Sequence, residues 1–218
     1  HPLATFRTVK EIEAHYCFPS PDDWDYSHLA RDIQGKEDRP LRGGGSEPFL
    51  TYKDLRGHEQ AYMDLAENPD IVHFVLDRLF DLAYQGTLRI FEAIPGKVLV
   101  SYVAEDLGGQ NGLLFSLRHI REFLLPRMKR MMDLVRQHGS YVFCHTDGAV
   151  RDVIPDLIGI GTTVLNPVQW RLAGMDPAGL KRDFGRSLVF HGAVDNQQTL
   201  PFGTPADVRH EVESLLGT

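Results

Sequence analysis

The chain has 218 residues, 42% of them hydrophobic, and a formal net charge of −7. This size and composition predict one soluble α/β domain with a sizeable core. The acidic balance and the lack of a long basic run argue against a nucleic-acid partner. No apolar stretch approaches the roughly 20 residues that span a bilayer, and no signal peptide is visible, so we expect no membrane partner. The two cysteines, Cys17 and Cys144, are far apart in sequence and predict free thiols in a reducing, cytoplasmic compartment.

The N-terminal part combines a short helix with an irregular stretch. A capping box at residues 8–11 starts a helix that runs to about His15. Residues 17–48 hold four prolines and the glycine triplet 43–45, and they are predicted to form an irregular, lid-like segment. The triplet and Ser46 resemble a phosphate loop, but the GKS ending and a preceding strand are missing, which favours a hinge or a lid.

Proline and glycine signals mark the helices of the rest of the chain. Asn68-Pro69 pairs an N-cap with a proline at the first helical position, and Pro126 interrupts a later helix. The predicted helices lie at residues 52–67, 69–93 and 116–138, and further helices start after residues 176 and 204.

Four short apolar runs predict parallel strands. They are residues 97–105, 141–145, 162–165 and 187–191, and a helix-like segment follows each of them. Apolar strands that alternate with helices are typical of a parallel sheet with right-handed crossovers, covered on both faces. An eight-stranded barrel typically needs about 250 residues. The pattern alone therefore leaves open a smaller open sheet and a piece of a barrel.

Polar residues end each predicted strand. In parallel α/β folds the chemistry sits at the carboxyl ends of the strands, so we expect these residues to converge at one end of the sheet. They are Glu105, Asp106, His145, Asp147, Asn166, Gln169, His191, Asp195 and Asn196.

His145 and Asp147 form the most informative pair. Residues two apart on a strand point the same way, so an imidazole and a carboxylate would face one site. Such a pair could bind a divalent metal such as zinc, or shift pKa values for proton transfer. The alternative is a histidine satisfied by hydrogen bonds beside an aspartate that caps the next helix.

The other strand ends offer supporting groups. Glu105 and Asp106 are adjacent and point to opposite faces, so one of them should face the site. Glu105 is a candidate third ligand or general base, and the alternative is a carboxylate that caps backbone amides. Asn166 offers a donor and an acceptor, and the glycine after His191 permits close approach of a ligand. For both, a structural role is the alternative.

Six stretches carry a family resemblance when their order and spacing are taken together. They are the turn at residues 105–108, REFLLPRMKRMMDLVRQHG (121–139), YVFCHTDG (141–148), IPDLIGIGTTVLNPVQ (154–169), MDPAGLKRDFG (175–185) and FHGAVDNQQTLPFGTPADV (190–208). The chain with these stretches resembles the uroporphyrinogen decarboxylase superfamily, which contains porphyrin-pathway decarboxylases and corrinoid-dependent methyltransferases.

The resemblance implies an α/β fold of the (β/α)8 TIM-barrel type. It implies an incomplete barrel that starts after the first strands and stops before the last strand, which carries a family functional histidine or cysteine. Residues 1–218 would then belong to a single barrel domain, with residues 17–48 as its irregular segment.

The resemblance also implies a metal site. Methyltransferase-like members bind zinc through a His-x-Cys pair at a strand end and a later cysteine. Here the pair is His145 and Asp147, so a carboxylate replaces the thiolate, and a harder divalent metal becomes conceivable. Glu105 is the expected third ligand.

The decarboxylases of the family instead use an N-terminal aspartate with arginines, a tyrosine and a serine. Tyr52 falls near the tyrosine, whereas Glu105 stands near the serine, which argues against uroporphyrinogen decarboxylation. A substrate with many carboxylates also calls for arginines, and Arg42 and Arg56 are the candidates in the nearest segments.

Three functional hypotheses follow. The first is metal-assisted methyl transfer with a corrinoid or folate carrier, for which a corrinoid protein is a candidate partner. The second is metal-free decarboxylation of uroporphyrinogen or a related tetrapyrrole acid in porphyrin biosynthesis. The third is a non-catalytic barrel that binds a tetrapyrrole or a partner protein. The expected catalytic residues are Glu105, Tyr52, His145 and Asp147, and the expected substrate-binding residues are Asp106, Asn166, Gln169, His191 and Asn196. The oligomeric state stays open.

Overall fold

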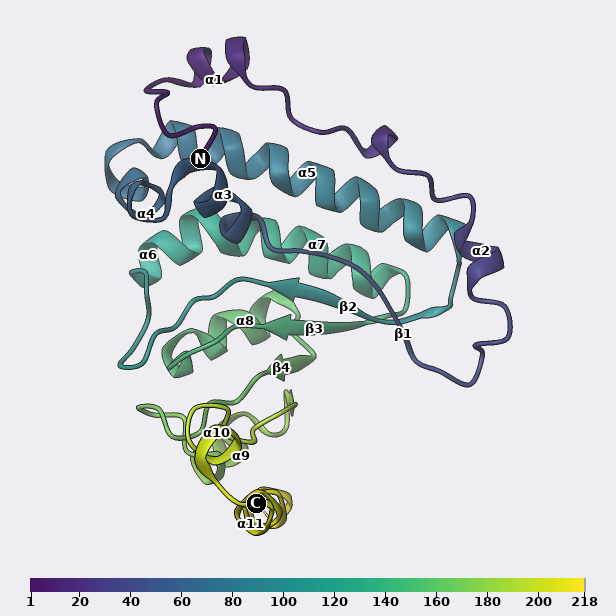
Figure 1. Ribbon diagram of the computed structural model, residues 1–218, viewed down its shortest axis with the longest axis vertical. Coiled ribbons are helices and arrows are strands. Elements are labelled where there is room, and N and C mark those ends of the chain that lie inside the picture. The colour runs from purple at the N-terminus through teal and green to yellow at the C-terminus, as the bar shows by residue number, and fades with distance from the viewer. Residues whose placement is uncertain (218) are drawn as a thin grey trace. The chain divides into compact units, whose positions relative to one another are not determined.

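The computed structural model describes residues 1–217 (Figure 1). The chain divides into two compact units. The first unit comprises His1–Glu105 and Arg118–Val142, and the second comprises Asp106–Leu117 and Phe143–Thr218. Five strands are present in residues 1–217, and every strand pair inside either unit is parallel. The predicted α/β class is therefore confirmed.

The first unit is a layer of helices over two parallel strands. Its elements are α1 (Val9–His15), η1 (Pro21–Asp23), α2 (Leu29–Asp32), β1 (Leu41–Ser46), α3 (Pro48–Arg56), α4 (His58–Glu67), α5 (Pro69–Ala93), β2 (Val98–Ala104), η2 (Ile120–Leu124) and α7 (Leu125–Gln137). The short α6 (Leu117–His119) leads into η2. Figure 1 shows α5 and α7 side by side, and both contact the strands.

Helix α5 has the predicted bounds because its sequence encodes them locally. Pro69 occupies the first turn, and the helix ends just before the Pro95-Gly96 turn. Its buried face includes Val72, Val75 and Leu79, which recur at the spacing of an amphipathic helix. This stripe therefore fixes which side of α5 faces the core.

The glycine triplet is part of a strand, which corrects the prediction of an irregular segment for residues 41–46. Strand β1 pairs with β2 with Gly45 opposite Tyr102. A Cβ atom at Gly45 would lie 1.8 Å from the Tyr102 carbonyl oxygen, and one at Gly44 would lie 2.4 Å from a Thr87 methyl carbon. Because β1 lies so close to β2 and α5, only glycine fits at these positions.

The helices predicted at residues 52–67 and 116–138 are each divided in the structure. Residues 52–67 are split into α3 and α4, because Gly57 has a φ of 98° between them. The later helix is interrupted near Pro126, as predicted. The π-helical turn η2 ends at Leu124, with the Leu125 N–H bonded to the Ile120 carbonyl five residues back, and α7 begins at Leu125 with Pro126 in its first turn. A proline is tolerated in the first turn because its missing N–H is not needed there.

The second unit carries the predicted strand–helix alternation. Its elements are β3 (Tyr141–His145, from Phe143 on), η3 (Arg151–Val153), α8 (Ile154–Ile160), β4 (Val164–Asn166), α9 (Pro177–Phe184), β5 (Val189–Phe190), α10 (Thr199–Phe202) and α11 (Pro205–Leu216). Strand β3 pairs with β4, and β4 pairs with β5, all in parallel. Asp176 and Thr204 cap α9 and α11 as predicted.

Within residues 1–217, none of the helices combines enough length with enough apolar character to cross a membrane.

Candidate functional site

The register of the second unit aligns three polar side chains in a row. His145 lies opposite Asn166 in the β3–β4 pair, and Leu165 lies opposite Phe190 in the β4–β5 pair. His191 therefore follows β5 at the level of Asn166. The Asn166 amide bridges the two imidazoles, with Oδ1 2.9 Å from His145 Nδ1 and Nδ2 2.9 Å from His191 Nδ1.

Two glycine turns bring the aspartates to the same place. The Gly108 N–H donates to the Asp147 carbonyl at 3.1 Å, and the Ala149 N–H donates to the Gly109 carbonyl at 2.8 Å. The buried hydroxyl of Thr146 accepts the Leu107 N–H at 3.0 Å. These bonds fix the turn at residues 106–109 against the turn at residues 146–149, so Asp106 and Asp147 lie close to each other.

Asp106, His145 and Asp147 form a cluster of potential ligands. His145 Nε2 lies 3.9 Å from Asp106 Oδ1 and 4.0 Å from Asp147 Oδ2. One ligand atom from each residue can be chosen so that all three lie within 4.8 Å of one another. The side chains are partly accessible, with 24% of His145, 34% of Asp106 and 46% of Asp147 exposed. The cluster is thus ordered by the fold and open to a small solute.

The electrostatics of the cluster favour a bound cation. The pKa of Asp147 is raised above its ordinary value of 3.8, mainly by burial; His145 opposes this shift and the nearby charge of Asp106 adds to it. Two carboxylates held this close repel each other when both are ionised. A cation between them would remove that repulsion.

The donor set suits a divalent metal ion. Three protein ligands with nitrogen and oxygen donors are typical of catalytic zinc sites, where neighbouring ligand atoms lie about 3.3 Å apart around the ion. The observed 3.9 and 4.0 Å separations require only a small closure. No thiolate joins the cluster from β3, because Cys144 is completely buried. Oxygen-rich sites also suit harder ions such as manganese or magnesium.

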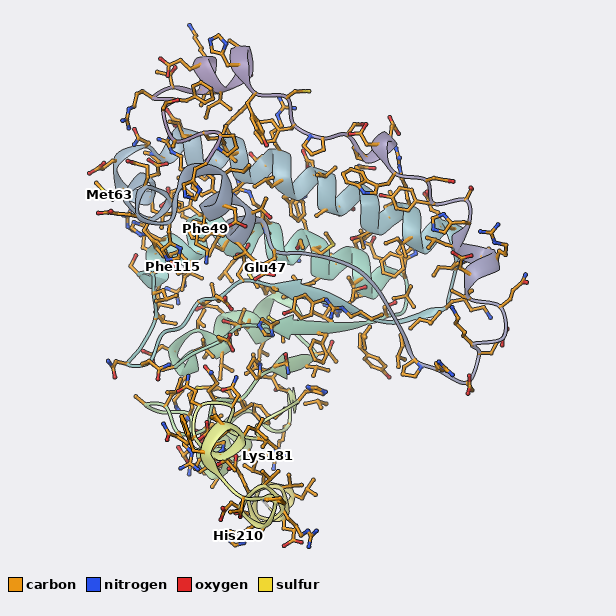
Figure 2. All side chains as sticks on the ribbon, viewed as in Figure 1. Glu47, Phe49, Met63, Phe115, Lys181 and His210 are labelled. Carbon is orange, nitrogen blue, oxygen red and sulfur yellow. The ribbon has the colours of Figure 1, made fainter. Side chains whose placement is uncertain are left out.

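The structure gives Glu105 a different role from that of the predicted third metal ligand. It belongs to the first unit and is 2% exposed. Its Oε1 accepts the backbone N–H of Phe49 at 3.1 Å, in the first turn of α3 (Phe49 is labelled in Figure 2). A carboxylate at a helix N-terminus is stabilised by the orphan amides there. The candidate third ligand is therefore Asp106, which the sequence analysis assigned to substrate binding.

Tyr52 and Arg56 are also placed in a structural network. Neither side chain has more than 1% exposed surface. Arg56 Nε donates to Asp64 Oδ2 at 2.6 Å, and the Tyr52 hydroxyl donates to the same oxygen. Burial and the Asp64 contact raise the pKa of Tyr52. This burial offers no support for a catalytic Tyr52 or for Arg56 as a substrate ligand.

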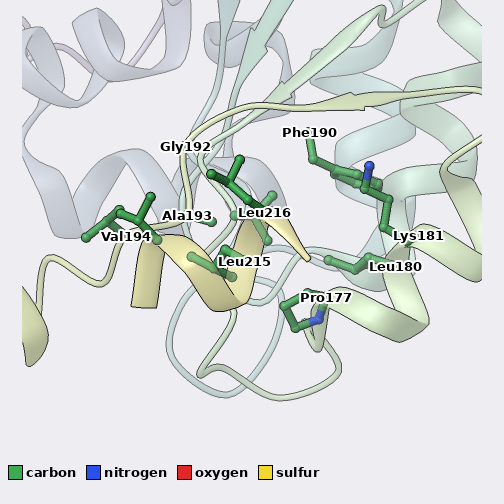
Figure 3. A pocket seen from close by; sticks show the side chains of 11 residues that line it. Pro177, Leu180, Lys181, Phe190, Gly192, Ala193, Val194, Leu215 and Leu216 are labelled. Atoms are coloured by element: carbon green, nitrogen blue, oxygen red, sulfur yellow. The ribbon is translucent and has the colours of Figure 1, made fainter. Parts of the chain in front are cut away.

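The remaining predicted residues lie at the loops after β4 and β5. Gln169 Oε1 accepts the Gly148 N–H at 2.6 Å, which joins the β4 loop to the Asp147 turn. Gln169 and Asn196 both line a cavity of about 220 Å³ between residues 167–172 and 192–197. A second hollow of about 340 Å³ lies between α9, β5 and α11 (Figure 3).

Asp195 anchors the β5 loop and also lines the cavity of about 220 Å³. Its carboxylate pairs with Arg171, and its N–H donates to Glu211 Oε1 at 2.6 Å. Trp170 Nε1 donates to the same Glu211 oxygen at 3.1 Å. The sequence analysis missed Glu211, since a lone glutamate in an amphipathic helix carries no local signal of burial.

Comparisons with known proteins identify the fold and the family of this chain. The fold is similar to that of a methyltransferase from Methanosarcina mazei, with a TM-score of 0.67 and 21% identity over 87% of this chain and 52% of that chain. At this identity the likeness shows a shared fold, and this chain spans about half the length of the methyltransferase. No curated protein sequence matches this chain. The family model described as uroporphyrinogen decarboxylase (URO-D) matches residues 27–218. The chain therefore belongs to the uroporphyrinogen decarboxylase family, as its sequence motifs predict.

Proposed function

We propose that this protein carries out metal-assisted methyl transfer that involves a corrinoid or folate carrier. The observation that carries the proposal is the Asp106–His145–Asp147 cluster, in which an imidazole nitrogen and two carboxylates converge within 4.8 Å. The fold shared with a methyltransferase from Methanosarcina mazei supports the same reaction class.

Each residue has a distinct task in this proposal. Asp106 and Asp147 supply negative charge and oxygen donors, and His145 supplies Nε2 as the nitrogen donor. A bound divalent ion would act there as a Lewis acid on the methyl donor or acceptor. Gln169 and Asn196 line the cavity of about 220 Å³ between the loops after β4 and β5, and they would offer amide donors and acceptors to a small-molecule substrate.

The charge of this region disfavours the alternative, decarboxylation of a tetrapyrrole with many carboxylates. Such a substrate calls for arginines that are available for bidentate contacts. In the second unit, Arg171 is paired with Asp195, and Arg151 is paired with Asp183. Asp106 and Asp147 add two more carboxylates at the site. A polyanion would therefore meet net negative charge.

The proposal is tested first by metal binding. Isothermal titration with Zn²⁺, Mn²⁺ and Co²⁺ should show one site, which His145→Ala and Asp106→Asn each abolish. His28→Ala is the matched control, because His28 and Asp32 form a histidine–aspartate pair at 3.8 Å outside the cluster. That variant should bind like the wild type.

The reaction is tested second, in the metal-loaded protein. Methyl transfer is measured with methylcobalamin and with methyl-tetrahydrofolate as carriers, and release of CO₂ is measured with uroporphyrinogen. We expect methyl transfer that His145→Ala abolishes. CO₂ release that His145→Ala leaves intact would establish the decarboxylase instead, and absence of both reactions and of metal binding would favour a non-catalytic barrel.

A further inference from the structure

We propose that Asn166 and His191 act as a tautomer lock on His145: together they hold its proton on Nδ1 and keep Nε2 as the donor atom that faces Asp106 and Asp147. Asn166 and His191 are thus positioning residues. This inference deepens the proposed function, since it concerns the same cluster, but its central test requires neither a metal ion nor turnover.

One atom at the bridge has an unambiguous role. The backbone carbonyl oxygen of His191 can only accept a hydrogen bond, and an amide atom of Asn166 lies 3.1 Å from it. That amide atom must be the NH₂ group, because an oxygen there would face another oxygen. The orientation of the Asn166 amide is therefore fixed by the backbone of β5 rather than by either histidine.

The fixed amide determines the proton position on His145. The other amide atom of Asn166 is Oδ1, an acceptor, and it lies 2.9 Å from His145 Nδ1. Nδ1 must therefore carry a proton in order to form this hydrogen bond. In the neutral imidazole, Nε2 then has the lone pair, and Nε2 is the atom 3.9 and 4.0 Å from the two carboxylates.

The Asn166 amide also sets the tautomer of His191, which is the opposite of that of His145. Its Nδ1 lies 2.9 Å from Asn166 Nδ2, which is a donor, so His191 Nδ1 must accept. The neutral His191 ring then carries its proton on Nε2. The Phe143 ring packs edge-on against this imidazole, with the ring centroids 4.9 Å apart and the planes at 69°. That contact restrains the ring in the orientation that the hydrogen bond needs.

Gly192 provides the space for the bridge. Its φ is 69°, and a Cβ atom there would lie 3.2 Å from Asn166 Nδ2. The carbonyl of Gly192 also accepts the Val168 N–H at 2.8 Å, which ties the β5 loop to the loop that follows Asn166. The bridge is therefore held by backbone contacts on both sides.

The lock matters because the two carboxylates attract a proton to Nε2. Without Asn166, a neutral His145 would be most stable with its proton on Nε2, directed at Asp106 and Asp147, and it could not donate that nitrogen to a cation. With the lock, Nε2 keeps its lone pair, and a cation can bind there without any rotation of the ring.

The test is nitrogen NMR of the metal-free protein labelled with ¹⁵N-histidine, at a pH where the imidazoles are neutral. Single His145→Gln and His191→Gln variants assign the two sets of signals. We expect His145 to show a protonated Nδ1 and an unprotonated Nε2, and His191 to show the reverse. A His145 ring protonated on Nε2 in the wild type would overturn the lock.

Two substitutions of Asn166 separate the lock from a general structural effect. Asn166→Leu removes the acceptor, so the proton of His145 should move toward Nε2. Asn166→Asp keeps an acceptor for His145 Nδ1 but removes the donor to His191, so His145 should keep its tautomer while His191 reverses. If Asn166→Leu leaves the His145 tautomer unchanged in a folded protein, the lock is wrong.

Metal titration of the same variants distinguishes the lock from the proposed function. Loss of a residue that orients a metal-binding histidine typically weakens metal binding about 10–100-fold. We expect this loss for Asn166→Leu and a smaller loss for Asn166→Asp. If the wild-type tautomers are as proposed but no metal binds, the lock stands and the metal function falls. If metal binds equally well to all three proteins, the lock falls and the metal site stands.

Discussion

Gly148 lies so close to Gly108 that a Cβ atom on Gly148 would stand 2.1 Å from the Gly108 carbonyl carbon. Gly148 also has a φ of 92°, which L side chains rarely adopt. Asp147 directly precedes Gly148, and Asp106 lies two residues before Gly108. The distance between the two carboxylates therefore depends on a contact between two backbones that tolerates no side chain.

Replacement of Gly148 by alanine should destabilise the protein and open the cluster. The left-handed backbone costs about 1–2 kcal/mol for a residue with a Cβ atom, and the clash adds an overpacking cost of about 1–3 kcal/mol. Denaturant unfolding should show this loss, and metal affinity should fall with it. Gly159→Ala is the control: Gly159 lies in α8 with no atom within 4 Å of the added Cβ. That change should stabilise the protein by about 0.5–1 kcal/mol, and equal effects of the two changes would contradict the close contact.

Asp147→Asn should stabilise the metal-free protein and weaken metal binding. The folded-state pKa of Asp147 is raised above 3.8, so its contribution to stability is present below that value and is lost as the pH rises through the folded-state pKa. At neutral pH the ionised Asp147 carboxylate destabilises the folded state. A neutral amide in its place removes this cost, so the denaturation midpoint should rise. Asp152→Asn, an exposed position of the same unit, should change neither property. A lower midpoint for metal-free Asp147→Asn would show that the charge of Asp147 stabilises the fold.

Arg56→Leu should cost about 3–5 kcal/mol in the free energy of unfolding, because it leaves the buried Asp64 carboxylate without its cation. Burial would raise the pKa of Asp64, yet the hydrogen bonds from Arg56, Tyr52 and other partners lower it below 3.8. Arg31→Leu is the control, since Arg31 pairs with Asp32 on the surface and should change stability by less than about 1 kcal/mol. Similar losses in both variants would contradict a buried network.

Tyr52→Phe separates a structural role from a catalytic one. Loss of the hydroxyl that donates to Asp64 should cost about 1–3 kcal/mol in unfolding free energy. Methyl transfer by the folded variant, measured below its unfolding range, should stay near the wild-type rate. Unchanged stability with lost activity would restore the catalytic role that the sequence resemblance implies.

Glu211 should make the β5 loop sensitive to acid. Burial would raise its pKa, but hydrogen bonds from Thr199, the Asp195 N–H and Trp170 lower it below 4.5. The stability that Glu211 contributes is therefore present above 4.5 and is lost as the pH falls through the lowered folded-state pKa. With Trp24 replaced by phenylalanine, emission from Trp170 alone should shift in that acid range. Glu211→Gln should show the shifted emission already at neutral pH, whereas Glu213→Gln, which is exposed on the same helix, should not.

Elements whose signals are local could be predicted from the amino-acid sequence. The bounds of α5 and the caps Asp176 and Thr204 follow from residues within one or two helical turns, where hydrogen bonds and apolar stripes act. The alternation of strands and helices predicted parallel pairing, and with it the convergence of His145, Asn166 and His191 at the strand ends. Local patterning was sufficient for these features because parallel pairing places all carboxyl ends on one edge.

Other features depend on contacts between residues that are distant in sequence, and the folded structure was needed to find them. It made a strand of the glycine triplet, because α5 and β2 approach it too closely for any side chain. It selected Asp106 rather than Glu105 for the cluster, because the Gly108–Gly148 contact holds Asp106 while Glu105 caps α3. It also placed Tyr52 in a buried ion-pair network and fixed the Asn166 amide through the His191 carbonyl. Each of these outcomes depends on a contact across at least 12 residues of sequence, which composition and periodicity do not encode.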